Sequence, residues 1–338
     1  EKKTMGESSS YEPAAWGSCT SFTQARSAYD QQAGRSYSAA QQKGLKAKDV
    51  VPAKIKTKST HPLVIATDLT GSMQDRPGIM FGKMPYMWSE IANSYLGADA
   101  EVSFIGVTDF GDSYPLQVQP FGQAEDLRKA LEKFIHGGGS GGSYDMHQHE
   151  RYDAAALYAA RNIEIPNAVR PTLIFIGDEE PYPETDPTVA AEMAQVNLEK
   201  ALKVEAVFQE LMRKFEVYFI LCPYGRTAND KNEAIDADTR RIQATWHKLL
   251  GPERVVMLTD AERVVDVIFG LLGQVTGKQE YFEKELNDRQ KKPGQVKTVM
   301  KSLATVYGKD KDQKLLKSGK SRLKGADDEK DGDAEPLL

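Results

Sequence analysis

The feature that most constrains the fold is an alternation between short apolar runs and longer stretches with helical spacing. Runs such as Leu63–Thr67, Val102–Val107 and Thr172–Ile176 are rich in β-branched residues. They are continuous rather than interrupted by polar residues, which is typical of strands buried on both faces of a sheet. Over residues 61–275, this alternation predicts an α/β domain with a doubly wound, mostly parallel central sheet and helices on both faces.

The other expected elements follow the same rule. Further strands are expected at 116–121, 217–222 and 254–258. Helices are expected from the turn after residue 72 to about Leu96, and at 124–135, 150–162, 187–214, 233–250 and 261–272. Met80, Met84 and Met87 recur at helical spacing, so we expect them in the core.

The two flanks differ in composition from this domain. Residues 1–60 form a polar arm rich in Ser, Gln, Ala, Gly and Lys, with a few aromatic residues able to pin it to something larger. In the C-terminal tail, 276–338, we expect helices at 279–290 and 295–307, followed by a basic block at 309–324 and an acidic block at 327–335. Opposite charge blocks of this kind are typical of a segment that is disordered or ordered by a partner.

Charge and cysteine content narrow the class of protein. The formal net charge of −5 argues against the chain as a whole being an electrostatic nucleic-acid binder. Cys19 and Cys222 lie far apart, without disulfide or zinc spacing, and Cys222 follows an apolar run that predicts burial. No run approaches the roughly 20 apolar residues of a membrane span, and no apolar core of signal-peptide length follows residue 1. We therefore expect a cytoplasmic protein.

Asp68 directly follows the first apolar run, and Thr70 and Ser72 come two and four residues later. In doubly wound sheets, ligands bind at the carboxyl ends of the strands. A second acid, Asp178, ends the apolar run that begins at Thr172. Carboxylates and hydroxyls form a hard, oxygen-only ligand set, which suits Mg²⁺ and leaves coordination positions for water or a partner.

The segment Asp68–Ser72 matches Asp-x-Ser/Thr-x-Ser, the first motif of the metal ion-dependent adhesion site, and here the chain resembles a von Willebrand factor A domain. Phe104–Asp112, Gly137–Gly139 and Leu173–Pro181 follow in the family's order. They are similar to the A-type domains attached to some alpha-kinases, although no kinase segment follows. The resemblance covers roughly residues 60–275.

The resemblance implies a set of metal ligands. Asp68, Thr70 and Ser72 would bind Mg²⁺, with Mn²⁺ and Ca²⁺ as alternatives, and Asp178 would coordinate through water. A third loop would supply another oxygen.

The third loop is where this sequence departs from the family. Related proteins place Asp or Thr directly after the glycines, but here Ser140 follows them, and then an insertion at 141–150. Ser140 is the first candidate for the third ligand and Ser143 the second. A neutral hydroxyl leaves the metal with more uncompensated charge, which would favour a carboxylate from a partner.

Simpler interpretations stand beside these. Asp68, Thr70 and Ser72 are also residues that cap helices, and Asp178 is also an acid suited to a turn at a strand end. The tract that contains His147, His149 and Glu150 could ligate zinc, but we favour a solvated loop, because no complementary ligands occur elsewhere. Asp109 and Asp112 are interpreted as turn residues, with a position of Asp109 near the metal as the alternative.

These patterns favour a metal-dependent protein–protein interaction module, not an enzyme, acting as a scaffold or adaptor that binds a partner Asp or Glu. The family resemblance suggests an AAA+ ATPase as that partner. One alternative is a Mg²⁺-dependent phosphohydrolase of the haloacid dehalogenase type, which needs a second Asp where Thr70 stands. Another is an RNA-binding platform that uses the basic arm and tail.

Overall fold

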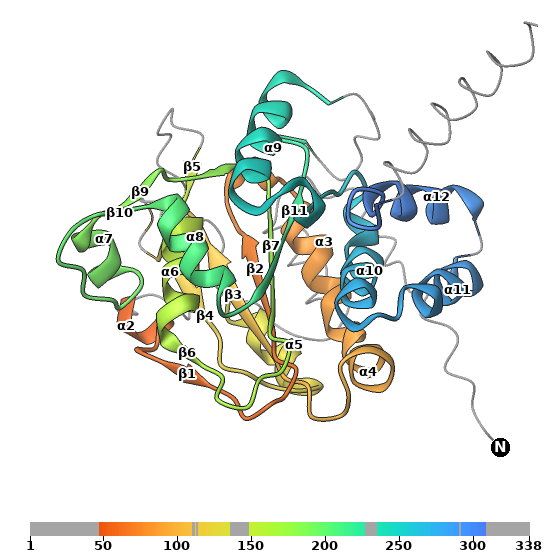
Figure 1. Ribbon diagram of the computed structural model, residues 1–338, viewed down its shortest axis with the longest axis horizontal. Helices are drawn as coiled ribbons and strands as arrows, with labels where there is room; N and C mark the ends of the chain where they lie inside the picture. The colour runs from red at the N-terminus through yellow and green to blue at the C-terminus, as the bar shows by residue number, and fades with distance from the viewer. Residues whose placement is uncertain are drawn as a thin grey trace, which may run out of the picture.

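The computed structural model describes residues 47–109, 112, 114–135, 149–226, 235–290 and 292–308. Its centre is a mostly parallel sheet of six strands (Figure 1), in the order β12 (Val255–Met257), β11 (Glu216–Leu221), β7 (Thr172–Gly177), β2 (Leu63–Asp68), β3 (Val102–Val107) and β4 (Leu116–Val118). All neighbouring pairs are parallel except β3 and β4, which are antiparallel. An α/β fold with a mostly parallel sheet is therefore confirmed.

The middle strands are buried along their whole length. Every residue of β2, β3 and β7 is buried, as their continuous apolar sequences predicted. Ile65 of β2 pairs with Phe104 of β3 on one side and with Ile174 of β7 on the other. This register aligns the carboxyl ends of the three strands at one edge of the sheet.

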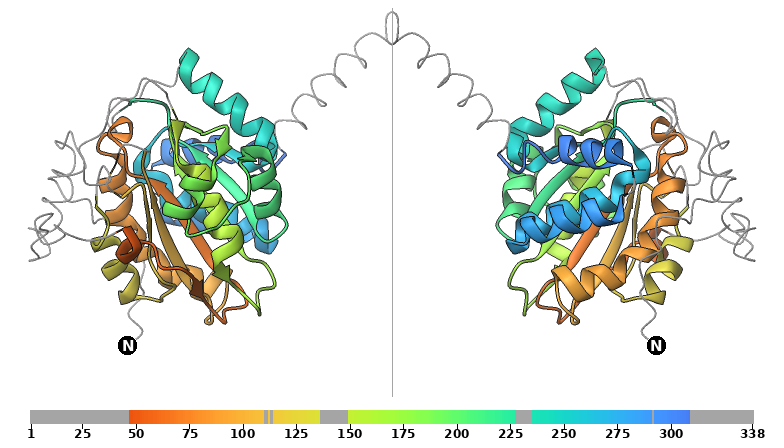
Figure 2. Two further views of the ribbon diagram at one scale, coloured as in Figure 1. Left: turned by 90° about the vertical axis from the view of Figure 1, so that its left-hand side faces the viewer. Right: turned by 90° about the vertical axis from the view of Figure 1, so that its right-hand side faces the viewer.

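Helices cover both faces of the sheet (Figures 1 and 2). One core cluster lies beneath α3 (Arg76–Lys83), η4 (Met84–Met87), α4 (Trp88–Glu90), η5 (Ile91–Tyr95), α5 (Glu125–Glu132) and α10 (Val264–Thr276). The other lies beneath α2 (Ala47–Val50), α6 (Tyr152–Asn162), α7 (Pro187–Glu192), α8 (Val204–Met212) and α9 (Ala237–Leu250). None of the described helices is long and apolar enough to cross a membrane.

Short elements complete the connections. Besides η4, 3₁₀ turns lie at η3 (Gly71–Met73), η7 (Pro252–Arg254) and η8 (Ala261–Arg263). The two-residue strand pairs are β1 (Ile55–Lys56) with β6 (Ile163–Glu164), β5 (His149–Glu150) with β8 (Glu180–Pro181), and β9 (Glu184–Thr185) with β10 (Leu202–Lys203). Val51 and Ile55 are buried in the core on the α6 side, so the packed structure includes residues before 61.

The first helical stretch is irregular. Between α3 and α4 lies the 3₁₀ turn η4, and η5 that follows is a π-helical turn. Pro85 lies within η4, where its missing N–H interrupts the α-helical ladder. Met80, Met84 and Met87 are nevertheless buried, which confirms their place in the core.

The prediction of a single helix over residues 187–214 is wrong. Helix α7 ends at Glu192, and α8 begins only at Val204. Gln195 has a φ of 54°, a left-handed conformation that ends a helix. The chain then turns back, so that Val196 N donates to Ala190 O at 2.9 Å, and β10 pairs with β9. Tertiary pairing here overrides local helical spacing.

The core continues beyond residue 275. The two helices expected in the tail are present, as α11 (Gln279–Arg289) and α12 (Pro293–Ser302). Buried residues that include Phe282 and Leu303 belong to the same core cluster as α10. At Gly270, an added Cβ would lie 2.2 Å from Cδ1 of Leu303, so glycine permits the close approach of this leucine to α10.

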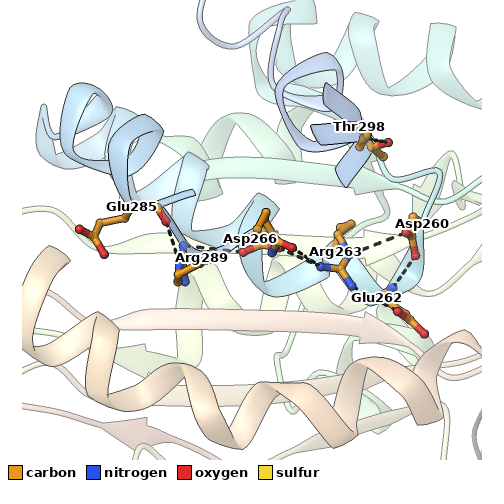
Figure 3. Close-up of polar contacts among 9 residues, drawn as sticks. Asp260, Glu262, Arg263, Asp266, Glu285, Arg289 and Thr298 are labelled. Carbon is orange, nitrogen blue, oxygen red and sulfur yellow. Dashed lines mark hydrogen bonds and ion pairs between the residues drawn. The ribbon is translucent and has the colours of Figure 1, made fainter. Parts of the chain in front are cut away.

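A buried ion cluster links the start of α10 to the end of α11 (Figure 3). Asp266 lies 3.6 Å from Nη1 of Arg263 and 3.7 Å from Nη2 of Arg289, and it accepts a hydrogen bond from Gln290 at 2.8 Å. Burial raises the pKa of Asp266, whereas the charges of the two arginines lower it. Because paired buried charges gain little net free energy, this cluster is weak evidence for stabilisation of the two helices.

Leu303→Ala tests whether α12 is an integral part of the core. Because Leu303 is fully buried, the substitution should lower the free energy of unfolding by about 2–5 kcal/mol, measured by urea denaturation. Lys297→Ala, at an exposed position of the same helix, is the control and should change it by no more than about 0.5 kcal/mol. Equal effects of the two substitutions would contradict the packing of α12.

Candidate functional site

Asp68, the last residue of β2, accepts two hydrogen bonds from one residue. Its Oδ1 accepts from the backbone N of Thr70 at 2.8 Å and from Thr70 Oγ1 at 2.6 Å. Asp68 itself is fully buried. Thr70 occupies the N-cap position of η3, but its side chain makes no capping hydrogen bond. The helix-capping interpretation of Thr70 is therefore wrong, since its hydroxyl serves the carboxylate instead.

The hydroxyls connect Asp68 to a second carboxylate. Ser72 Oγ lies 3.1 Å from Thr70 Oγ1 and donates to Asp178 Oδ1 at 2.9 Å. Asp178 directly follows β7, the neighbour of β2, and its Oδ2 accepts from the backbone N of Gly225 at 3.2 Å. The structure thus joins Asp68, Thr70, Ser72 and Asp178 in one hydrogen-bonded group. The third-loop candidates Ser140 and Ser143 lie outside the described residues.

Tyr152, the first residue of α6, also binds Asp68, and sequence analysis missed it. Its hydroxyl donates to Asp68 Oδ2 at 2.7 Å. At Gly177 an added Cβ would lie 1.7 Å from this hydroxyl, so only glycine leaves room for the contact. Edge-to-face contacts hold the ring of Tyr152 against Phe175, Phe219 and Trp246. A glycine at the end of an apolar strand was the only sequence signal of this arrangement.

Arg76 is a second residue that sequence analysis did not single out. It begins α3, is almost completely buried, and donates from Nη1 to Pro223 O at 2.7 Å. This bond anchors the loop after β11, from which Gly225 reaches Asp178. The positive charge of Arg76 also opposes the increase in the pKa of Asp178.

Burial destabilises the charged form of the acids in the site. Loss of hydration raises the pKa of Asp68 to about 6, against the effect of its hydrogen bonds from Thr70 and Tyr152. Burial and then the charge of Asp68 raise the pKa of Asp178 to about 7. Burial and then the charge of Asp178 raise the pKa of Glu179 to about 9. Negative charge at this edge of the sheet is therefore poorly compensated by the protein.

The solvated loop expected around His149 and Glu150 is wrong. These residues form β5, which pairs with β8, and Glu150 is buried. The ring of His149 lies 5.4 Å from that of Tyr182. His147, the other histidine of the zinc hypothesis, lies outside the described residues. Within the described ranges, no three or more His, Cys, Asp or Glu side chains are grouped so as to hold a metal ion by themselves.

Asp109 makes the turn interaction expected of it, and its carboxylate has a second partner. Its backbone N donates to Asp112 Oδ2 at 3.1 Å, which is a turn interaction. Its carboxylate Oδ1 accepts from the Tyr182 hydroxyl at 2.6 Å. The charge of Asp109 also contributes to the raised pKa of Glu179. Asp109 therefore lies within electrostatic range of the strand-end acids.

Comparisons with known proteins give only distant structural similarity. No family model matches the chain, and no curated protein matches it. The pilus adhesin SpaC from Lactobacillus rhamnosus GG is 13% identical, with a TM-score of 0.45 over 66% of this chain and 31% of the adhesin. Proximal thread matrix protein 1 from the mussel byssus is 9% identical, with a TM-score of 0.42 over 65% of this chain and 49% of that protein. Less than half of either protein is spanned, and these values carry no conclusion about function.

The buried acids predict how the stability of the metal-free protein depends on pH. Their pKa values are higher in the folded chain than in the unfolded chain, so the folded state binds protons more tightly. Through these groups, stability in EDTA should fall as the pH rises from about 4 to about 7, and further towards pH 9 for Glu179.

Urea denaturation in EDTA at several pH values measures this dependence. Asp178→Asn should flatten it, because the substitution removes one of the groups that take up a proton. Asp126→Asn changes an exposed acid of α5 and should leave the profile as in the wild type. A wild-type profile no steeper than that of Asp178→Asn would contradict the assignment.

Proposed function

We propose that this chain contains a von Willebrand factor A-type domain that binds a divalent cation, Mg²⁺ in the first instance, and through it a partner protein. One observation carries the proposal: Asp68 and Asp178, at the carboxyl ends of adjacent strands, are joined through the hydroxyls of Thr70 and Ser72. The proposed metal ligands are Asp68, Thr70 and Ser72, with Asp178 acting through water.

Proton counting supports a cation between these oxygens. Each hydroxyl has one proton to donate. Thr70 gives its proton to Asp68, and Ser72 gives its proton to Asp178. When both carboxylates are charged, no proton remains for the 3.1 Å contact between the two hydroxyl oxygens. Their lone pairs then face each other, an arrangement that a cation coordinated by both oxygens would stabilise.

The charge of the site supports the same proposal. Both carboxylates are fully buried, the charge of Asp68 raises the pKa of Asp178, and Arg76 opposes only part of this increase. A divalent cation would offset the rest. Carboxylate and hydroxyl oxygens are the hard ligands that Mg²⁺ prefers, and Mg²⁺ usually keeps several waters. One of these waters is the position that a partner's Asp or Glu would take.

The strand order also suits this proposal. From β2 the chain moves outwards to β3 and β4, and it then returns to add β7, β11 and β12 on the other side of β2. The order therefore reverses between β2 and β7, which is where doubly wound sheets bind ligands. We attribute to the chain the doubly wound arrangement of an A-type domain, with β4 as its antiparallel edge strand.

An interaction module fits these residues better than a hydrolase does. A phosphohydrolase that used Asp68 as nucleophile would need an acid or base two residues later. That residue is Thr70, whose hydroxyl is bonded to Asp68. We therefore propose a scaffold or adaptor, with an AAA+ ATPase as the partner that the family resemblance suggests and the cytoplasm as its location.

Titration calorimetry with MgCl₂ tests the cation. The wild type should bind one Mg²⁺, and Asp68→Asn should weaken binding at least tenfold, because it removes the charge of a direct ligand with little change of shape. Asp126→Asn, at an exposed position of α5, is the matched control and should bind like the wild type. Absence of Mg²⁺ binding to the wild type, tested also with Mn²⁺ and Ca²⁺, would contradict the proposal.

Affinity capture tests the proposed partner. Immobilised wild-type protein in Mg²⁺ should retain a protein from the source cell that is released by EDTA and is not retained by Asp68→Asn. Mass spectrometry would identify it, and substitution of its contacting Asp or Glu should abolish retention. Capture that is equal for the wild type and Asp68→Asn would show that binding does not pass through this site.

A further inference from the structure

Glu150 is a buried carboxylate whose burial the proposed ligands do not explain. It lies in β5 and is 4% exposed. Its Oε2 is buried and has no hydrogen-bond partner among the described residues. A buried carboxylate oxygen without a partner costs free energy, so a native structure usually supplies a partner, a water or an ion.

The backbone fixes Glu150 at the edge of the sheet where Asp68 and Asp178 lie. Glu150 pairs with Pro181, and Tyr182 N donates to Glu150 O at 3.4 Å, which ties it to the segment after β7. Arg151 N, the next donor along the chain, bonds Thr108 O after β3 at 3.2 Å. Two residues after Glu150, Tyr152 donates to Asp68. Glu150 is thus held between the segment that follows β7 and the segment that follows β3.

Arg151 and His149, the sequence neighbours of Glu150, contact other groups, although Nε of Arg151 has no hydrogen-bond partner among the described residues. The guanidinium of Arg151 contacts Asp153 at 2.9 Å and lies over the ring of Tyr182, 4.3 Å from its centre. His149 lies 3.8 Å from Glu180. Burial raises the pKa of Glu150 most, and the charge of Asp68 follows. Among the described residues, the charges that act most on Glu150 are all negative and belong to other acids, so a cation would offset them.

We propose that Glu150 is an outer ligand of the cation, whose Oε2 accepts a hydrogen bond from a cation-bound water. This inference rests on the proposed function. Because Asp68, Thr70 and Ser72 are the proposed direct ligands, Glu150 is assigned a role through water. It adds a negative charge where the third-loop candidates, both serines, supply none. Outer partners of this kind typically change metal affinity by about 10–100-fold.

The experiment compares Mg²⁺ affinity in Glu150→Gln and the wild type by titration calorimetry. Glu150→Gln should bind Mg²⁺ about 10–100-fold more weakly. Its stability in EDTA should equal or exceed that of the wild type, because burial disfavours the charged form of Glu150 and glutamine is neutral. Glu184→Gln, an exposed acid on β9, is the matched control and should change neither quantity. A purely structural role would instead lower stability in EDTA and leave the affinity unchanged.

Two outcomes separate this inference from the proposed function. Wild-type protein that binds no divalent cation would overturn the proposed function itself. Affinity lost in Asp68→Asn but kept within about twofold in Glu150→Gln would overturn only the role of Glu150. If Glu150→Gln does not fold, Glu150→Asp retains the charge but withdraws it by one methylene. That variant should bind Mg²⁺ more weakly than the wild type, and unchanged affinity would overturn the inference.

Discussion

The site depends on the parallel pairing of β2 with β7. Their register runs from Leu63 opposite Thr172 to Thr67 opposite Ile176. The carboxyl ends of the two strands therefore lie at the same edge of the sheet. Asp68 and Asp178 therefore emerge side by side and can share the hydroxyl bridge. A slip of one residue would turn every side chain of β2 to the other face of the sheet. Because both faces are buried, the apolar side chains fix this register and, with it, the spacing of the carboxylates.

Much of this arrangement could be predicted from the sequence, because its signals are local. Continuous apolar runs identified the strands, and the spacing of Asp68, Thr70 and Ser72 placed their side chains in one turn. Asp178 was identified because it ends another such run. The alternation of strands and helices also predicted the mostly parallel sheet. The signal for each strand and for each acid lies within a few consecutive residues.

What could not be predicted depends on contacts between distant segments. Tyr152 reaches Asp68 across 84 positions of sequence, and Arg76 reaches Pro223 across 147. No local pattern distinguishes such a tyrosine or arginine from any other. Glu150 was assigned to a solvated loop because no complementary metal ligands were found elsewhere in the sequence, yet strand pairing buries it. The expected helix at 187–214 failed similarly, since the pairing of β9 with β10 outweighs helical spacing.

The close approach of Tyr152 to Gly177 limits how the site around Asp68 can change during evolution. The tyrosine that orients Asp68 is also an aromatic component of the interior, wedged among Phe175, Phe219 and Trp246. The orientation of the Asp68 carboxylate cannot change unless the hydrophobic interior around Tyr152 is repacked. Transplanting the Asp-x-Thr-x-Ser turn alone onto another scaffold would therefore transfer the oxygens but not their orientation.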